Sequence, residues 1–270
     1  MTLLEVLRRA TGYLETHGSS SPRLDAEILL AHTLGIRRLD LYLQFDRPLE
    51  ESQLAPYREL TARRGRGEPV AYLTGQREFM ALEFAVTADV LVPNPDTELL
   101  VQRAVEWGRS RSGALRFADV GTGSGCIAVA VAHYLPGAVV DAVDVSAAAL
   151  AVAEVNVGRH GVGERVRLLE GDLAGPLSGI YDAILANLPY VKPGADLPPE
   201  VTAQPAVALF GGATLVNRLL AAVPALLAPG GIALLEIDPA ITGDLVVEGF
   251  EGWKLLRDLG GHDRVLEAWK

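Results

Sequence analysis

Several features are scarce or missing in this chain of 270 residues, and each absence excludes a class of protein. Cys126 is the only cysteine, so an intramolecular disulfide or a cluster of cysteine metal ligands is impossible. No apolar run reaches the length of about 18 residues that a membrane-spanning helix needs. The first residues also lack the basic and apolar regions of a signal peptide. We therefore expect a soluble cytoplasmic protein without a metal site.

Positive charge is also in short supply, since 24 lysines and arginines stand against 34 acidic residues and the formal net charge is -10. Proteins that hold nucleic acid mainly through phosphate contacts need a cationic face, so we expect no stable nucleic-acid binding. Residues 1–75 carry ten basic and ten acidic residues, whereas the remainder carries 14 and 24. This asymmetry in charge, together with a change in the residue pattern, predicts a domain boundary between residues 70 and 95.

The first part of the chain, residues 1–72, has the pattern of a small helical bundle. Apolar residues recur at helical spacing over 3–14 and over 22–34. A third helix is expected to end near Arg64, and Pro56 predicts that it starts late or kinks. Such a module either covers the larger domain or binds a macromolecular partner. We favour the second role, because a simple enzyme for small molecules needs no such module.

A linker is expected over residues 73–94, with a β-hairpin in which Tyr72–Phe79 leads into Leu82–Val86. Two prolines stiffen its end, and Asp96 or Thr97 is placed to cap the following helix.

From residue 95 to residue 270, predicted helices and strands alternate, which implies an α/β domain with a parallel sheet covered on both faces. Ligands bind such sheets outside the carboxyl ends of the strands. The expected strands are Phe117–Val120, Ala138–Val143, Arg165–Leu169, Tyr181–Ala186 and Ile232–Ile237, followed by a terminal hairpin of Trp253–Leu256 and Arg264–Ala268.

Three glycines, Gly121, Gly123 and Gly125, follow the first of these strands and open a helix. Small residues let the backbone approach a ligand closely, although a tight turn alone would explain them. Asp144 ends the next strand, 23 residues after Gly121, where a carboxylate can bind ribose hydroxyls as well as cap a helix. Together these signals favour an adenosine-containing cofactor, with Asp172 near the adenine.

The tetrapeptide Asn187-Leu188-Pro189-Tyr190 follows an apolar strand. The Asn187 carboxamide oxygen and the Leu188 carbonyl are acceptors, and Tyr190 offers an aromatic face. Two acceptors and a flat face suit a planar group that bears an NH2, although an ordinary turn would use the same residues.

At this point the sequence resembles the class I S-adenosylmethionine-dependent methyltransferases, and more closely the release-factor glutamine methyltransferases of the PrmC/HemK family. The similarity covers nearly the whole chain. It rests on Leu24–Leu30, Glu68–Gly75, Arg77–Phe79, Pro93–Glu98, Asp119–Gly125, Pro205, Ala208–Leu209, Gly211–Gly212, Leu235–Ile237, Arg257–Asp258 and Asp263–Arg264.

The resemblance implies a Rossmann-like seven-stranded sheet with helices on both faces, preceded by a small N-terminal helical bundle that recognises the substrate. It also implies methyl transfer from S-adenosyl-L-methionine, leaving S-adenosyl-L-homocysteine. The acceptor is the side-chain amide nitrogen (N5) of the glutamine in the Gly-Gly-Gln motif of class 1 peptide chain release factors, a modification that modulates translation termination. We expect a monomer.

Site residues carried over from the family fall into two groups. The glutamine amide is assigned to Asn187, Leu188, Pro189 and Tyr190. The cofactor is assigned to Gly121, Thr122, Gly123, Ser124, Gly125, Asp144, Asp172, Leu173, Asn187, Thr97 and Leu91. Three positions depart from the family pattern: Leu188 stands where proline is usual, Asn94 where arginine is frequent and Leu173 where an aromatic residue is common.

Other functions remain open. The tetrapeptide also resembles that of adenine-N6 methyltransferases, which act on RNA or DNA. A nicotinamide oxidoreductase would use the glycine loop and Asp144 but not the tetrapeptide, and a non-catalytic binding module would have kept only the fold.

Overall fold

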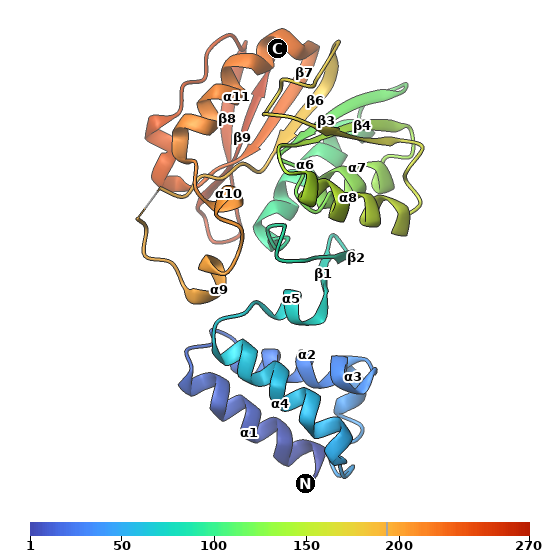
Figure 1. Ribbon diagram of the computed structural model, residues 1–270. Coiled ribbons are helices and arrows are strands. Elements are labelled where there is room, and N and C mark those ends of the chain that lie inside the picture. The colour runs from blue at the N-terminus through green and yellow to red at the C-terminus, as the bar shows by residue number, and fades with distance from the viewer. Residues whose placement is uncertain (193) are drawn as a thin grey trace. The chain divides into compact units, whose positions relative to one another are not determined.

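A computed structural model describes residues 1–192 and 194–270, and the chain divides into two compact units (Figure 1). The first unit comprises Met1–Gln76 and Asp196–Ala203, and the second comprises Arg77–Ala195 and Gln204–Lys270. The chain therefore leaves the second unit after Ala195 to contribute a short segment to the first. No helix in the described ranges is long and apolar enough to cross a membrane.

The first unit is a helical bundle around an apolar core to which Leu7, Leu29 and Tyr57 contribute. Pro56 neither delays nor shortens its fourth helix, which begins at Glu51. At the start of this helix, the Glu50 N–H donates to Gln53 Oε1 at 3.2 Å. The first helical turn is therefore capped before the chain reaches the proline. The helices are α1 Leu3–Thr16, α2 Pro22–Leu34, α3 Arg38–Leu41, α4 Glu51–Gly65, α5 Val70–Thr74 and α9 Pro199–Thr202.

A buried ionic cluster explains why residues 196–203 belong to this unit. Arg64 donates to Asp25 at 2.7 Å and also pairs with Glu200, and its side chain is almost fully buried. A Cβ added to Gly67 would lie 2.6 Å from Pro199 Cβ, so the segment packs closely there. A buried charge is tolerated only when it is paired, and Glu200 supplies part of that pairing.

The expected hairpin is present as β1 Gln76–Phe79 and β2 Leu82–Ala85. Met80 and Ala81 connect the strands with positive φ angles of 52° and 56°, the geometry of a two-residue type I′ turn. Asn156 holds the second strand, since its Oδ1 accepts from the Ala85 N–H at 2.7 Å and its Nδ2 donates to the Ser124 carbonyl at 2.8 Å.

The second unit is built on a seven-stranded sheet in the order β5-β4-β3-β6-β7-β9-β8 (Figure 1). The strands are parallel except β9, which runs antiparallel to both of its neighbours. The strands are β3 Leu115–Val120, β4 Ala138–Asp144, β5 Val166–Glu170, β6 Tyr181–Ala186, β7 Leu227–Glu236, β8 Gly252–Arg257 and β9 Asp263–Trp269.

Both faces of this sheet are buried. Successive side chains of a strand point to opposite faces, so each strand contributes to two apolar clusters. Phe117 packs in the cluster that contains α6 and α7, whereas its neighbour Ala118 packs in the cluster that contains α11. The predicted fold class is thus confirmed. The remaining elements are α6 Glu98–Arg109, α7 Cys126–Tyr134, α8 Ala147–Arg159, α10 Ala206–Leu209 and α11 Gly212–Leu226, with 3-10 turns η1 Pro95–Thr97 and η2 Pro239–Asp244.

Candidate active site

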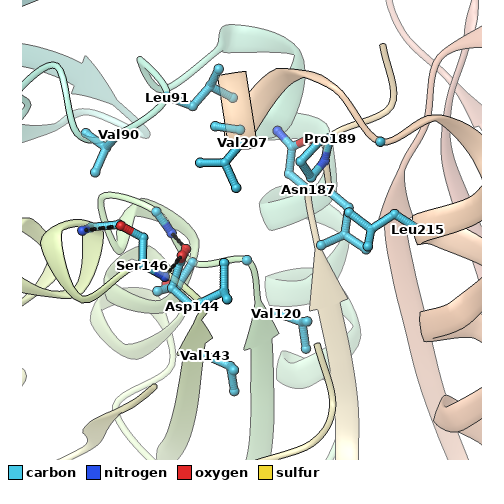
Figure 2. A pocket seen from close by; sticks show the side chains of 18 of the residues that line it. Val90, Leu91, Val120, Val143, Asp144, Ser146, Asn187, Pro189, Val207 and Leu215 are labelled. Carbon is cyan, nitrogen blue, oxygen red and sulfur yellow. Dashed lines mark hydrogen bonds between the residues drawn. The ribbon is translucent and has the colours of Figure 1, made fainter. Parts of the chain in front are cut away.

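A cavity of about 420 Å³ opens at the carboxyl ends of β3, β4 and β6, entirely within the second unit. Its size is typical of a small-molecule site. All the site residues expected from the sequence line it except Gly125 and Tyr190. In Figure 2, Asp144 and Ser146 lie on one side of the space, and Asn187 and Pro189 lie on the other.

The glycine loop takes a backbone path that other residues adopt only with strain. Gly121, Gly123 and Gly125 have φ angles of 77°, 55° and 79°. A Cβ on Gly121 would approach Leu188 Cδ2 to 3.0 Å, and one on Gly125 would lie 3.1 Å from Ala153 Cβ. At Gly123 nothing lies within 4 Å of the added atom, so a side chain there would project into open space.

The N–H groups of this loop are largely used within the protein. Those of Gly121 and Thr122 donate to the Val143 carbonyl at 2.8 and 2.9 Å, and that of Gly123 donates to Asp144 Oδ2 at 2.8 Å. They are therefore unavailable to cradle a phosphate. This arrangement differs from dinucleotide sites, in which the loop and helix N–H groups receive the pyrophosphate.

Asp119 lies beneath the loop and is fully buried. Its Oδ2 accepts from the Thr122 hydroxyl at 2.6 Å and from the Ala128 N–H at 3.1 Å, which ties β3 to the loop and to α7. Oδ1 has no hydrogen-bond partner in the described residues. Burial disfavours the charged form and raises the pKa of Asp119 to about 7.

Asp144 is oriented by the main chain. Its Oδ2 accepts from Gly123 N–H, and its Oδ1 accepts from Ser146 N–H at 2.9 Å. The Ser146 hydroxyl in turn caps α8 by accepting from Ala149 N–H at 3.2 Å. Each carboxylate oxygen has a second lone pair, so Asp144 can still accept from two ligand hydroxyls.

Asp172 and Leu173 follow β5 and line the same cavity. Asp172 pairs with Arg218 of α11 at 2.5 Å. Leu173 has a φ angle of 48°, a left-handed conformation that is unusual for a leucine.

The tetrapeptide after β6 places Asn187, Leu188 and Pro189 at the cavity. Asn187 Nδ2 donates to Thr97 Oγ1 at 3.0 Å, which leaves its Oδ1 as an acceptor. Tyr190 does not line the cavity. Its hydroxyl donates instead to Glu236 Oε1 at 3.3 Å.

Comparison with known proteins agrees with this architecture. Residues 5–75 match the family described as the PrmC N-terminal domain, and residues 94–234 match the methyltransferase small domain. A release factor glutamine methyltransferase of Rhodopirellula baltica is 41% identical, over 100% of this chain and 96% of the relative. Another, from Moorella thermoacetica, is 39% identical over 100% of this chain and 99% of its own.

The chain belongs to the release factor glutamine methyltransferase family.

Solved structures support the fold of this family member. A 16S rRNA methyltransferase of T. thermophilus, solved with AdoMet and guanosine, aligns with a TM-score of 0.54 at 20% identity, over 72% of this chain and 49% of its own. A methyltransferase from Pyrococcus furiosus aligns with a TM-score of 0.52 at 18% identity, over 82% and 99%. The resemblance inferred from the sequence motifs is thus confirmed at the level of family and fold.

In the linker motif Pro93–Glu98, the residues predicted to cap the following helix, Asp96 and Thr97, do not do so. Thr97 has helical backbone angles and makes no side-chain cap on α6, and Asp96 pairs with Arg264 at 3.3 Å. Asn94 supplies the cap, because its side chain accepts from the Asp96 N–H at 3.1 Å at the start of η1. Thr97 is thereby left to receive Asn187.

The three residues that depart from the family pattern all lie at or beside the cavity. Leu188 is buried at 4% exposure in the core beside α11, against Gly121. Asn94 caps η1 and lines the cavity, and Leu173 lines it as well.

The apolar wall formed by Val207, Phe210 and Leu215 was not foreseen as part of the site. These residues lack chemical groups that signal a site, and a pairing between Val191 and Phe210 brings their segment beside the tetrapeptide. A signal did exist, because the family motif includes the neighbouring Ala208 and Gly211.

Proposed function

We propose that the protein transfers a methyl group from S-adenosyl-L-methionine to N5 of the glutamine in the Gly-Gly-Gln motif of class 1 release factors, and so modulates translation termination. The observation that carries this proposal is the hydrogen bonding of the Asn187 side chain. Its Nδ2 is tied to Thr97, so its Oδ1 is the end left to accept from an NH2 group, at the cavity that Asp144 also lines.

The charge of the cavity supports a sulfonium cofactor. The lining contains three carboxylates, Asp89, Asp144 and Asp172, and its basic side chain, Arg218, is paired with Asp172. S-adenosylmethionine carries a positive sulfur and an ammonium group, whereas a nicotinamide dinucleotide carries a negatively charged pyrophosphate. Complementary charge favours the first ligand over the second.

Each part of the cofactor has a fitting group in this chain. Asp144 would accept from the ribose hydroxyls, and Asp172, Leu173 and Leu91 would flank the adenine. The open space at Gly123 would admit the methionyl part, which a larger residue would obstruct. The product would be S-adenosyl-L-homocysteine.

Positioning dominates the mechanism we propose, because an amide nitrogen is a poor nucleophile. When bound, S-adenosylmethionine supplies a methyl group activated by a positive sulfur: the C–S bond breaks as the C–N bond forms, and its electron pair stays on sulfur. Asn187 Oδ1 and the Leu188 carbonyl would hold both N–H bonds of the glutamine amide in line with that methyl group. As positive charge grows on nitrogen, the same oxygens would stabilise it. The proton would be lost after methyl transfer, to water or to another group.

Each part of the chain would have its own role in the reaction. Residues 1–72 would recognise the release factor, residues 73–94 would link the domains, and residues 95–270 would carry out catalysis. A protein that methylates release factors would act in the cytoplasm, and we expect it to be a monomer there.

A test of this function uses labelled S-adenosylmethionine and a purified release factor, with the label located by mass spectrometry. We expect the label on the glutamine of the Gly-Gly-Gln motif and none on a factor whose glutamine is substituted. RNA and DNA serve as parallel acceptors, because the tetrapeptide also suits the amino group of adenine. Label on adenine in place of glutamine would contradict the proposal.

A further inference from the structure

The segment Leu91–Pro93, which we call the linker arm, forms part of the cavity wall although it belongs to no helix or strand. Leu91 and Pro93 line the cavity, and Val92 lies between them in the chain. Within the described residues, these three make no hydrogen bond between main-chain groups. Main-chain groups that are withdrawn from water need partners, so side chains must hold the linker arm in place.

Two side chains supply those partners, and both belong to the second unit. The Val92 N–H donates to Gln204 Oε1 at 2.9 Å. The Pro93 carbonyl accepts from Arg77 Nε at 3.3 Å, which is longer than most N–H···O bonds. The bond to Gln204 is therefore the stronger restraint on the linker arm.

Gln204 also begins the segment that forms the apolar wall of the cavity. Val207 and Phe210, within and after α10, line the cavity from this segment. Figure 2 shows Leu91 and Val207 across the space from Asp144. The hydrogen bond from Val92 to Gln204 thus joins two parts of the cavity wall that lie 112 positions apart in sequence.

The two parts that this bond joins offer apolar surface to a ligand. Leu91 is half-buried, and Val207 is 60% exposed although it is a large apolar side chain. Apolar surface at a cavity is stabilised when the flat, weakly polar base of a ligand covers it. An adenosine whose ribose hydroxyls donate to Asp144 would extend toward these side chains.

We propose that Gln204 is a positioning residue for the cofactor: by accepting from the Val92 N–H, it holds the linker arm so that Leu91 and Val207 together cover the adenosine part of S-adenosylmethionine. This proposal rests on the proposed function for the identity of the ligand. Gln204 does not line the cavity, so it acts through the linker arm and not on the cofactor itself.

This arrangement also allows the product to leave. A hydrogen bond between neutral groups contributes little net free energy, so the linker arm can open by breaking its bond to Gln204. Release of S-adenosyl-L-homocysteine requires such an opening, and product release limits turnover in many enzymes. Removing the acceptor at position 204 should favour the open arm and speed the release.

The test compares Gln204→Met with Gln204→Glu. Methionine has a similar volume but accepts no useful hydrogen bond, so S-adenosyl-L-homocysteine should dissociate about fivefold faster in stopped-flow measurements and bind correspondingly more weakly in calorimetry. Glutamate keeps an acceptor oxygen of the same reach and loses only the amide NH2. It should therefore recover most of the wild-type affinity.

Gln53→Met is the matched control. Gln53 Oε1 also accepts from a main-chain N–H, that of Glu50 at 3.2 Å, but it lies in α4 of the first unit. The rate of cofactor dissociation should stay at the wild-type value in this variant. A purely structural loss would lower the unfolding midpoint of both methionine variants and leave their dissociation rates equal.

A second readout needs no ligand. The Val92 amide hydrogen, followed by NMR, should exchange with solvent faster in Gln204→Met than in wild type, and at about the wild-type rate in Gln204→Glu. This measurement reports on the hydrogen bond itself, whatever the cavity binds.

Wild-type dissociation of S-adenosyl-L-homocysteine from Gln204→Met would overturn the proposal, and so would wild-type exchange at Val92 in that variant. A Gln204→Glu variant that releases the product as fast as Gln204→Met would also overturn it, because the effect would not come from the acceptor. If the wild type binds the product but leaves release factors unmethylated, the proposed function fails and the dissociation rates still decide the role of Gln204. If the wild type binds no product, the cofactor assignment fails, and with it this role.

Discussion

On one side of the cavity the main chain holds the polar groups: Asp144 accepts from the N–H groups of Gly123 and Ser146. On the other side, a side chain holds them: Asn187 Nδ2 donates to Thr97 Oγ1. The first arrangement joins residues at most 21 positions apart, and the second joins residues 90 positions apart. A recurrent cofactor can be bound by a local loop, whereas a particular acceptor is selected by contacts that the tertiary fold assembles.

Each side also has a buried carboxyl whose pKa is raised to about 7, Asp119 behind the loop and Glu236 behind the tetrapeptide. Asp119 accepts from the Ala128 N–H as well as from Thr122 and so stiffens the loop. Within the described residues, Glu236 accepts from the Tyr190 hydroxyl, a side chain, and not from the main chain. We expect both carboxyls to make the stability of the fold depend on pH.

The largest effect should come from the acceptor side. Asn187→Ala removes the oxygen that stabilises charge on the reacting nitrogen, and kcat should fall by about 10²–10³. Steady-state kinetics with a release factor measures this. Asn217→Ala is the control, since the Asn217 side chain is likewise hydrogen-bonded, through two bonds, but lies outside the cavity. Near-wild-type turnover in Asn187→Ala would refute the assignment.

A smaller effect, on binding alone, is expected at Asp144. Loss of hydrogen bonds to a charged group costs about 1.5–3 kcal/mol, so Asp144→Ala should weaken S-adenosylmethionine binding about 10- to 100-fold. Isothermal titration calorimetry is the measurement. Asp89→Ala is a matched control, because Asp89 lines the same cavity but bonds to Thr87. Equal affinities in all three proteins would remove Asp144 from the ribose site.

The loop itself can be tested against a glycine of similar conformation. Gly123 and Gly161 have φ angles of 55° and 63°, and a Cβ on either meets nothing within 4 Å. Alanine at either position should cost about 1–2 kcal/mol of stability through backbone strain. Only Gly123→Ala should also weaken cofactor binding, by about tenfold. Similar binding by both variants would argue against a ligand beside Gly123.

The smallest effect concerns stability and pH. The pKa of Asp119 is raised above its usual value, so its protonated form stabilises the fold below about pH 4, and this contribution is lost as pH rises through 7. One such group gives at most ~1.4 kcal/mol per pH unit. Asp119→Asn should therefore narrow the difference in unfolding midpoint between pH 5 and pH 8, leaving the part due to Glu236. An unchanged difference would contradict the burial argument.

What the sequence predicts well lies close to strand ends. The seven strands, the glycine loop and the polar residues that follow β4 and β6 all have local signatures: an apolar run, then small or polar residues. Parallel strands bring those ends to one edge of the sheet, so the position of Asp144 and Asn187 at a common cavity follows from the pattern.

What the sequence could not predict depends on contacts between distant segments. The sequence predicts that Asp96 or Thr97 caps the following helix, because Asp and Thr before a helix often do so. Thr97 instead makes no cap on α6 and accepts from Asn187, Asp96 pairs with Arg264, and Asn94 caps η1. The sequence suggests an aromatic face at Tyr190 and gives no sign that its hydroxyl donates to Glu236. Nothing local near Glu200 indicates that it pairs with Arg64 in the helical unit.

A co-crystal structure with S-adenosyl-L-homocysteine and a Gly-Gly-Gln peptide tests the central claim most directly. The account predicts Asn187 Oδ1 within hydrogen-bond distance of the glutamine amide nitrogen, Nδ2 still on Thr97, and Asp144 on the ribose hydroxyls. A glutamine side chain bound away from Asn187, or one that receives the Asn187 Nδ2 group, would contradict it.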